Sequence, residues 1–92
     1  HRDPWSLTVI LEVATFDIKP GQQDAFQAVF PQAAAVISRA AGYVSHELQR
    51  GIEADTKFLL LVRWHSVRHH MEGFRQSPDF AQWRALLSPH FN

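Results

Sequence analysis

The chain has 92 residues, of which 46% are hydrophobic and 12% aromatic, with a formal net charge of zero and no cysteine. A chain of this length forms one small domain whose core is marginal when it folds alone. The absence of a basic stripe argues against nucleic acid as the main partner, and the absence of cysteine excludes disulfides and thiol catalysis. No apolar run is long enough to span a bilayer and no signal-peptide pattern is present, so we expect a cytoplasmic protein without a membrane partner.

Three segments have the composition of β-strands. Residues 7–16 (LTVILEVATF) are apolar and rich in β-branched side chains. Residues 43–50 (YVSHELQR) alternate, with His46 on the apolar side. Residues 57–64 (KFLLLVRW) contain five consecutive apolar residues, which is typical of a strand buried on both faces. The polar turn at residues 51–56 predicts that the second and third strands form a hairpin.

Helical patterns fill most of the remaining chain. Residues 22–40 carry apolar side chains at three- and four-residue spacing, which predicts an amphipathic helix. Pro31 should kink this helix or split it at Phe30, because proline lacks a backbone donor and clashes with the preceding turn. Two shorter helices are predicted at residues 66–76 and 78–87.

Turn and capping residues support these boundaries. Pro20-Gly21 is a strong turn signal, and Gly42 suits the left-handed residue that ends a helix. Ser66 and Ser77 can each cap the helix that follows, and Pro78 is favoured at a first helical position.

The element order is therefore β-α-β-β-α, a ferredoxin-like α+β order in which the last strand is either missing or dispensed with. We expect one domain over residues 1–92, with its core at about residues 7–87. The helices can cover one face of the sheet, whereas the first and third strands are apolar on both faces. The uncovered face predicts a homodimer, because a second copy of the chain is the simplest partner.

Several motifs resemble the antibiotic biosynthesis monooxygenase family of dimeric α+β barrels. They are TFDIKPGQQDAF, AAGYVSHEL, FLLLVRW and GFRQSPDFAQWRALL, and the resemblance covers residues 9–87. Its most specific parts are Pro20-Gly21, Gly42, Trp64 at the strand end, and Ser77-Pro78 with Phe80. The resemblance implies a barrel formed by two sheets, with a pocket between the sheet and helices of each protomer. Some members oxygenate aromatic polyketides or quinols without metal or flavin, others degrade haem, and many have no assigned activity.

Neither haem nor a metal is expected here, and no cofactor is predicted. Haem-degrading members carry Asn, Trp and His at three places where this chain has Ala14, Gly73 or Phe74, and Arg84. His65 and His69 have a spacing that can hold a metal, but solvated histidines are the simpler interpretation.

His70 is the predicted catalytic base. A cofactor-free oxygenase requires a proton acceptor near neutral pH, and histidine is the side chain suited to it. His70 shares a helix face with Phe74 and with Val67. An interface or surface histidine is the alternative. His46 is the second choice, as a substrate-binding residue or as a core histidine with a satisfied hydrogen bond.

Aromatic side chains are predicted to form the walls of the pocket. Trp64, Phe74 and Trp83 are the predicted substrate-binding residues, although Trp64, Phe80 and Trp83 could equally be core. Glu12 is expected either to pair with Arg63 or to lie at a solvated edge. Arg75 and Arg84 are expected to be surface or interface charges.

These observations predict a cofactor-independent monooxygenase that acts on a flat phenolic or quinol-type small molecule. The substrate would supply the electrons, while the protein deprotonates it, excludes water and holds it beside oxygen. The alternative is a non-catalytic small-molecule-binding or stress-response module that keeps the dimer and the pocket. A buried His or Tyr facing an apolar cavity indicates an enzyme, whereas a filled or wholly apolar interior indicates a binding or structural role.

Overall fold

The computed structural model describes residues 9–92, so the start of the first predicted strand lies outside the described residues. Three antiparallel strands form one sheet in the order β1-β3-β2. The strands are β1 (Ile10–Asp17), β2 (Tyr43–Arg50) and β3 (Lys57–Trp64). β2 and β3 pair as the predicted hairpin.

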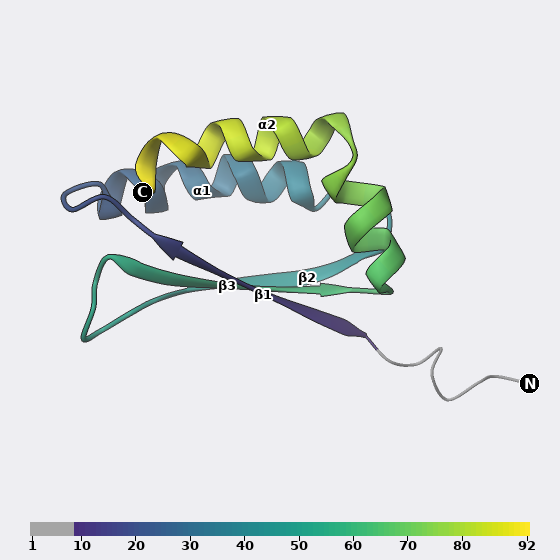
Figure 1. The fold of residues 1–92 in the computed structure, drawn as a ribbon, viewed down its shortest axis with the longest axis horizontal. Coiled ribbons are helices and arrows are strands. Elements are labelled where there is room, and N and C mark those ends of the chain that lie inside the picture. The colour runs from purple at the N-terminus through teal and green to yellow at the C-terminus, as the bar shows by residue number, and fades with distance from the viewer. Residues whose placement is uncertain (1–8) are drawn as a thin grey trace, which may run out of the picture.

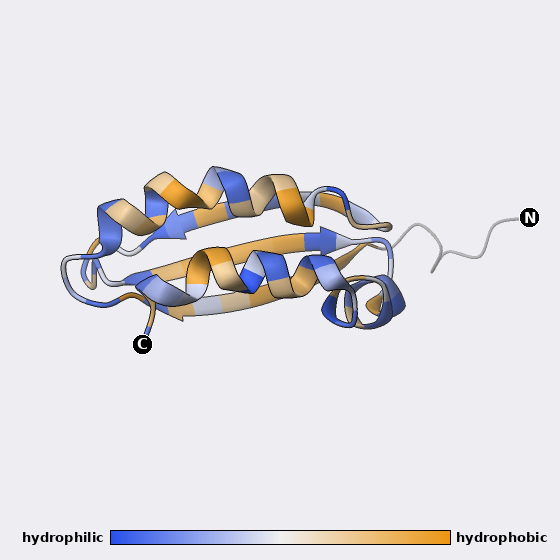
Figure 2. Ribbon diagram, turned by 90° about the horizontal axis from the view of Figure 1, so that it is seen from above, coloured by the Kyte–Doolittle hydropathy of each residue, from blue (hydrophilic) through white to orange (hydrophobic). Residues whose placement is uncertain are grey.

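Both helices lie on one face of this sheet. They are α1 (Gln23–Ile37) and α2 (Pro78–Leu87). They run side by side over the strands, and the opposite face of the sheet carries no helix (Figure 1, Figure 2). The ferredoxin-like α+β fold predicted from the sequence is confirmed.

A π-helix, η2 (His69–Arg75), joins β3 to α2 where the sequence predicted an ordinary α-helix. It stands at the end of the sheet where β3 ends (Figure 1). The predicted caps are present at both ends of this connection. Ser66 Oγ accepts a hydrogen bond from the His69 N–H at 3.1 Å, and Ser77 Oγ accepts one from the Phe80 N–H at 3.4 Å. Because π-helices are rare and occur often at functional sites, η2 directs attention to the side chains it carries.

The core lies between the helices and the inner face of the sheet. The side chains of β3 alternate strictly, and its inward residues are buried: Phe58, Leu60, Val62 and Trp64. The buried face of α1 consists of Phe26, Phe30, Ala33, Val36 and Ile37. Aromatic contacts join the two layers, such as the edge-to-face pair of Phe26 and Phe58 with ring centroids 4.9 Å apart.

The predicted split of the first helix at Phe30 does not occur. α1 runs unbroken from Gln23 to Ile37 with Pro31 inside it. Proline leaves the carbonyl of the residue four positions earlier without its usual N–H partner. That residue is Gln27, and both Gln27 and Pro31 are exposed, so water can satisfy the carbonyl while the buried face keeps the helix in place.

On the outer face of the sheet, apolar side chains of β1 and β3 are left uncovered by the part of the chain that the structure describes. Leu11 and Val13 on β1 are 49% and 55% exposed. Leu59 and Leu61 on β3 point to the same face and are only half-buried. The sequence predicted that β3 would be buried on both faces, and one chain covers only one of them. Among the described residues, no helix has the length and apolar character to cross a membrane.

The end of the chain adds a short contact to the edge of β1. After α2, the 3₁₀-helix η3 (Ser88–His90) brings Phe91 into an antiparallel bridge with Ile18. The N–H of Asn92 donates to the carbonyl of Asp17 at 2.8 Å. In a ferredoxin-like fold the last strand pairs with the first, so this bridge lies where that pairing would begin.

Replacing Gly42 with Ala is expected to destabilise the fold markedly. Gly42 has φ +84, as the sequence predicted, and a Cβ there would lie 2.2 Å from Cγ of His69. The left-handed backbone alone costs about 1–2 kcal/mol in a residue with a side chain, and the His69 contact adds to it.

Gly21 provides the matched control for this experiment. It has φ +87, but a Cβ there would meet nothing within 4 Å. Urea denaturation of both alanine variants should therefore show the larger loss of unfolding free energy for Gly42→Ala. Equal losses would mean that η2 shifts to accommodate the new methyl group.

Candidate active site

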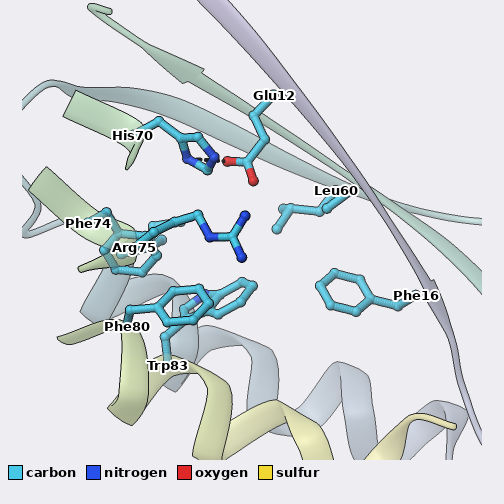
Figure 3. Close-up of a pocket in the computed structure, with 10 residues that line it drawn as sticks. Glu12, Phe16, Leu60, His70, Phe74, Arg75, Phe80 and Trp83 are labelled. Carbon is cyan, nitrogen blue, oxygen red and sulfur yellow. Dashed lines mark ion pairs between the residues drawn. The ribbon is translucent and has the colours of Figure 1, made fainter. Parts of the chain in front are cut away.

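A cavity of about 160 Å³ lies between the inner face of the sheet, η2 and α2. Most of its lining is apolar: Ala14, Phe16, Ile37, Leu60, Phe74, Phe80 and Trp83. Its polar lining consists of Glu12, His70 and Arg75 (Figure 3). The cavity therefore combines flat aromatic walls with three ionisable groups.

Glu12 reaches the cavity because β1 alternates strictly between its two faces. Its neighbour in β3 is Val62, whose side chain is fully buried on the inner face. Arg63 pairs instead with Leu11 on the outer face. The Glu12–Arg63 pair considered from the sequence is therefore wrong, because the two side chains lie on opposite sides of the sheet. Glu12 does lie on the edge strand β1, the other alternative considered, but its side chain is only 29% exposed and lines the cavity.

Two side chains from other elements contact the Glu12 carboxylate. The indole Nε1–H of Trp64 donates to Glu12 Oε1 at 3.0 Å. His70 Nδ1 lies 3.1 Å from the same oxygen, and its side chain is 15% exposed. The ring is not aligned for a hydrogen bond to this oxygen, so the contact is an ion pair when His70 is protonated. An inward carboxylate is costly without such partners.

This arrangement assigns different roles to the two nitrogens of His70. Nδ1 is buried and faces Glu12. No hydrogen bond to Nε2 is found within residues 9–92, so Nε2 is the nitrogen left for a ligand. A carboxylate beside one ring nitrogen holds the imidazole in place and leaves the other nitrogen to accept a proton.

Aromatic rings build the rest of the site in two layers. Trp64 is fully buried behind the cavity and packs against His70 and Phe74, with ring centroids 5.5 and 5.7 Å away. Phe80 and Trp83 stack at 5.9 Å with an interplanar angle of 24°. Phe74 meets both of them edge-on. These rings provide flat walls for a planar ligand.

Arg75 is exposed, in agreement with the surface position expected from the sequence, and it also lines the cavity. Its Cζ lies 5.5 Å from the centre of the Phe80 ring. The guanidinium extends between the Glu12–His70 pair and the Phe80–Trp83 pair (Figure 3). Within residues 9–92, no ion pair of Arg75 is found. The sequence carried no signal for this position, because the wider turn of a π-helix changes which residues share a face.

Not all of the site residues predicted from the sequence lie at the cavity. His70, Phe74 and Trp83 line the cavity, and Trp64 stands behind it. His46 lies outside it, because β3 separates β2 from β1 and Glu12.

His46 has partners of its own in that position. Its Nδ1 is 2.5 Å from the Tyr43 hydroxyl, and its ring packs against Phe30. Burial raises the pKa of Tyr43 above its usual value of 10.0, so the hydroxyl remains protonated near neutral pH and can donate to His46. These contacts agree with the alternative that His46 is a core histidine with a satisfied hydrogen bond.

The two histidines considered for metal binding have no third potential ligand grouped with them in the described part of the chain. His65 and His69 have ring centroids 6.4 Å apart. His69 Nδ1 is instead 2.9 Å from Ser66 Oγ. No group of three or more potential metal ligands occurs among residues 9–92.

The fold and this cavity define a small ferredoxin-like α+β domain with an aromatic cavity. Comparison with known sequences identifies the family. The antibiotic biosynthesis monooxygenase family matches residues 9–86, so the chain belongs to that family. It is 42% identical over 79 residues to the uncharacterized protein YczJ of Bacillus subtilis, covering 86% of this chain and 83% of that protein.

Two solved structures extend the comparison. An antibiotic biosynthesis monooxygenase assigned by similarity in Bordetella bronchiseptica is 40% identical and superposes with a TM-score of 0.86, covering 90% of this chain and 85% of that one. SnoaB of Streptomyces nogalater is 23% identical with a TM-score of 0.77, covering 89% and 82% of the two chains. The likeness to SnoaB shows a common fold.

Proposed function

We propose that the protein is a cofactor-independent monooxygenase that acts, as a homodimer, on a flat phenolic or quinol-type small molecule. The observation that carries this proposal is the Glu12–His70 pair, set in the wall of an otherwise largely aromatic cavity. Family membership supports an oxygenase-like activity. SnoaB, which shares the fold, is described as a cofactor-independent oxygenase.

The cavity supplies what such a reaction needs from the protein. The Phe80–Trp83 stack and Phe74 offer faces against which a planar ring can pack. The apolar lining excludes water around the reacting atoms. His70 Nε2 would accept the proton of a phenolic hydroxyl, while Glu12 stabilises the imidazolium that forms.

The remaining steps balance with dioxygen as the only co-reactant. A ring carbon of the deprotonated quinol forms a bond to one oxygen atom of O₂, and the resulting peroxide takes a proton back from His70. Loss of the proton on that ring carbon breaks the O–O bond, so one oxygen stays as a carbonyl and the other leaves as water. A quinol and O₂ thus give a hydroxyquinone and water, and the substrate supplies all four electrons.

The polarity of the cavity favours this function over a non-catalytic binding module. A module that only holds an apolar ligand has no use for an inward carboxylate, whose burial is costly. Here Glu12 lies beside His70 and accepts a hydrogen bond from the indole N–H of Trp64. A histidine that lines a cavity beside a carboxylate is placed to accept a proton from a bound ligand.

Oxygen uptake tests the proposal directly. We expect the purified protein, after treatment with a chelator, to consume oxygen with members of a panel of hydroquinones, dihydroxynaphthalenes and anthrones. Mass spectrometry with isotopically labelled dioxygen should place one oxygen atom in the quinone product. No acceleration over the buffer reaction with any member of the panel would contradict the proposed function and favour a binding module.

A further inference from the structure

We propose that the ligand of this cavity is a single-ring phenolic acid, in which a carboxylate on the ring binds the guanidinium of Arg75. The phenolic part of this inference rests on the proposed function. The number of rings in the ligand is inferred from the size of the cavity, and the negative charge of the ligand is inferred from the position of Arg75.

The cavity is small for a polycyclic substrate. Its volume is about 160 Å³, close to the roughly 150 Å³ of an engineered apolar cavity that takes up one benzene molecule. Pockets for larger, drug-sized molecules run from about 300 to 1,000 Å³. Phe16 and Leu60 close the sheet side opposite η2 (Figure 3). One aromatic ring with small substituents fills this space.

Arg75 provides the positive charge that would recognise an anion. Its guanidinium is directed into the space between the Glu12–His70 pair and the Phe80–Trp83 pair (Figure 3). The contact with the Phe80 ring favours a planar orientation. Arg75 is exposed, and a guanidinium can bind a carboxylate through two parallel charge-assisted hydrogen bonds.

The other charged group of the cavity sets the direction of the ligand. Glu12 would repel a ligand carboxylate, so the carboxylate end turns toward Arg75. The hydroxyl end can then approach His70, whose Nδ1 is engaged by Glu12. The three ionisable groups thus favour one orientation of a hydroxylated aromatic acid.

Binding in the absence of oxygen separates this inference from the proposed chemistry. We would titrate the protein anaerobically by calorimetry with 2,5-dihydroxybenzoate, its neutral amide, and the bicyclic 1,4-dihydroxy-2-naphthoate. The single-ring acid should bind at least about 10-fold more tightly than its amide, as expected for a hydrogen bond to a charged group. It should also bind more tightly than the bicyclic acid.

Two variants complete the test. Arg75→Gln should weaken the binding of 2,5-dihydroxybenzoate by about 10-fold or more, while it changes the affinity for the amide by less than about twofold. Arg84→Gln replaces another exposed arginine that does not line the cavity, and it should leave both affinities unchanged. Circular dichroism confirms that each variant is folded.

Three results would overturn the inference. They are no detectable binding of 2,5-dihydroxybenzoate at millimolar concentration, equal affinity for the acid and its amide, and tighter binding of the bicyclic acid. If the acid binds through Arg75 but no oxygen is consumed, the proposed function fails while this assignment of the ligand stands.

Discussion

Replacing His70 with Asn is expected to lower the rate of oxygen uptake about 100-fold, the loss typical of a general base. Asparagine fills similar space in the cavity wall but cannot accept a proton near neutral pH. The rate is measured with an oxygen electrode at saturating substrate. His46→Asn is the matched control, because His46 is also partly buried but lies outside the cavity. Its rate should stay within about twofold of the wild type.

A double-mutant cycle with Glu12 sharpens this test. Glu12→Gln keeps an oxygen that can accept the indole N–H of Trp64 but removes the charge beside His70. Because Glu12 acts through His70, the double variant should lose no more activity than His70→Asn alone, as for other groups that act as a unit. If the loss of activity in the double variant equalled the product of the two single losses, Glu12 would contact the substrate independently of His70. A His70→Asn rate within about twofold of the wild type would show that His70 is not the base.

The order of the elements could be predicted because hydrophobic periodicity and turn chemistry agree along this chain. The Ser77 cap marks the start of α2, and the left-handed Gly42 marks the turn before β2, although α1 already ends at Ile37. The split expected at Pro31 does not occur, because the local cost of the proline is outweighed by the buried face of α1. A proline signal acts on three or four residues, whereas the packing of α1 involves the whole helix.

The candidate site was only partly predictable, because its members come together through tertiary structure. His70 and Phe74 share a local spacing that the sequence displays. Glu12 could not be placed, since a shift of one residue in strand register would turn it to the outer face. The strand order keeps His46 away from the cavity, and the π-helical turn brings Arg75 to its lining. Neither feature is visible as a pattern in the sequence.

Replacing Leu61 with Arg is expected to convert the proposed homodimer into a monomer. Leu61 lies on β3, the central strand of the sheet, and pairs across the outer face with Val13 and Glu47. This face carries apolar side chains that no element among residues 9–92 covers. A symmetric dimer would bury Leu61 from both copies, so each substitution acts twice in one interface.

The size of this effect follows from the cost of burying charge. An arginine without a partner costs several kcal/mol when it is removed from water, and about 1.4 kcal/mol corresponds to a tenfold change in the dissociation constant. Two arginines of like charge facing each other should therefore weaken association by a factor of about 10³ or more. Sedimentation velocity at micromolar concentration should give the mass of two chains for the wild type and of one chain for Leu61→Arg.

Val67→Arg is the matched control for the dimer experiment. Val67 is 56% exposed, comparable to Val13 on the outer face, but it lies between β3 and η2 instead of on the sheet. The same charge introduced there should leave the dimer intact. Circular dichroism must show that Leu61→Arg keeps its secondary structure, since the substituted side chain points away from the core. A folded Leu61→Arg variant that remains a dimer would mean that the two chains associate through another surface.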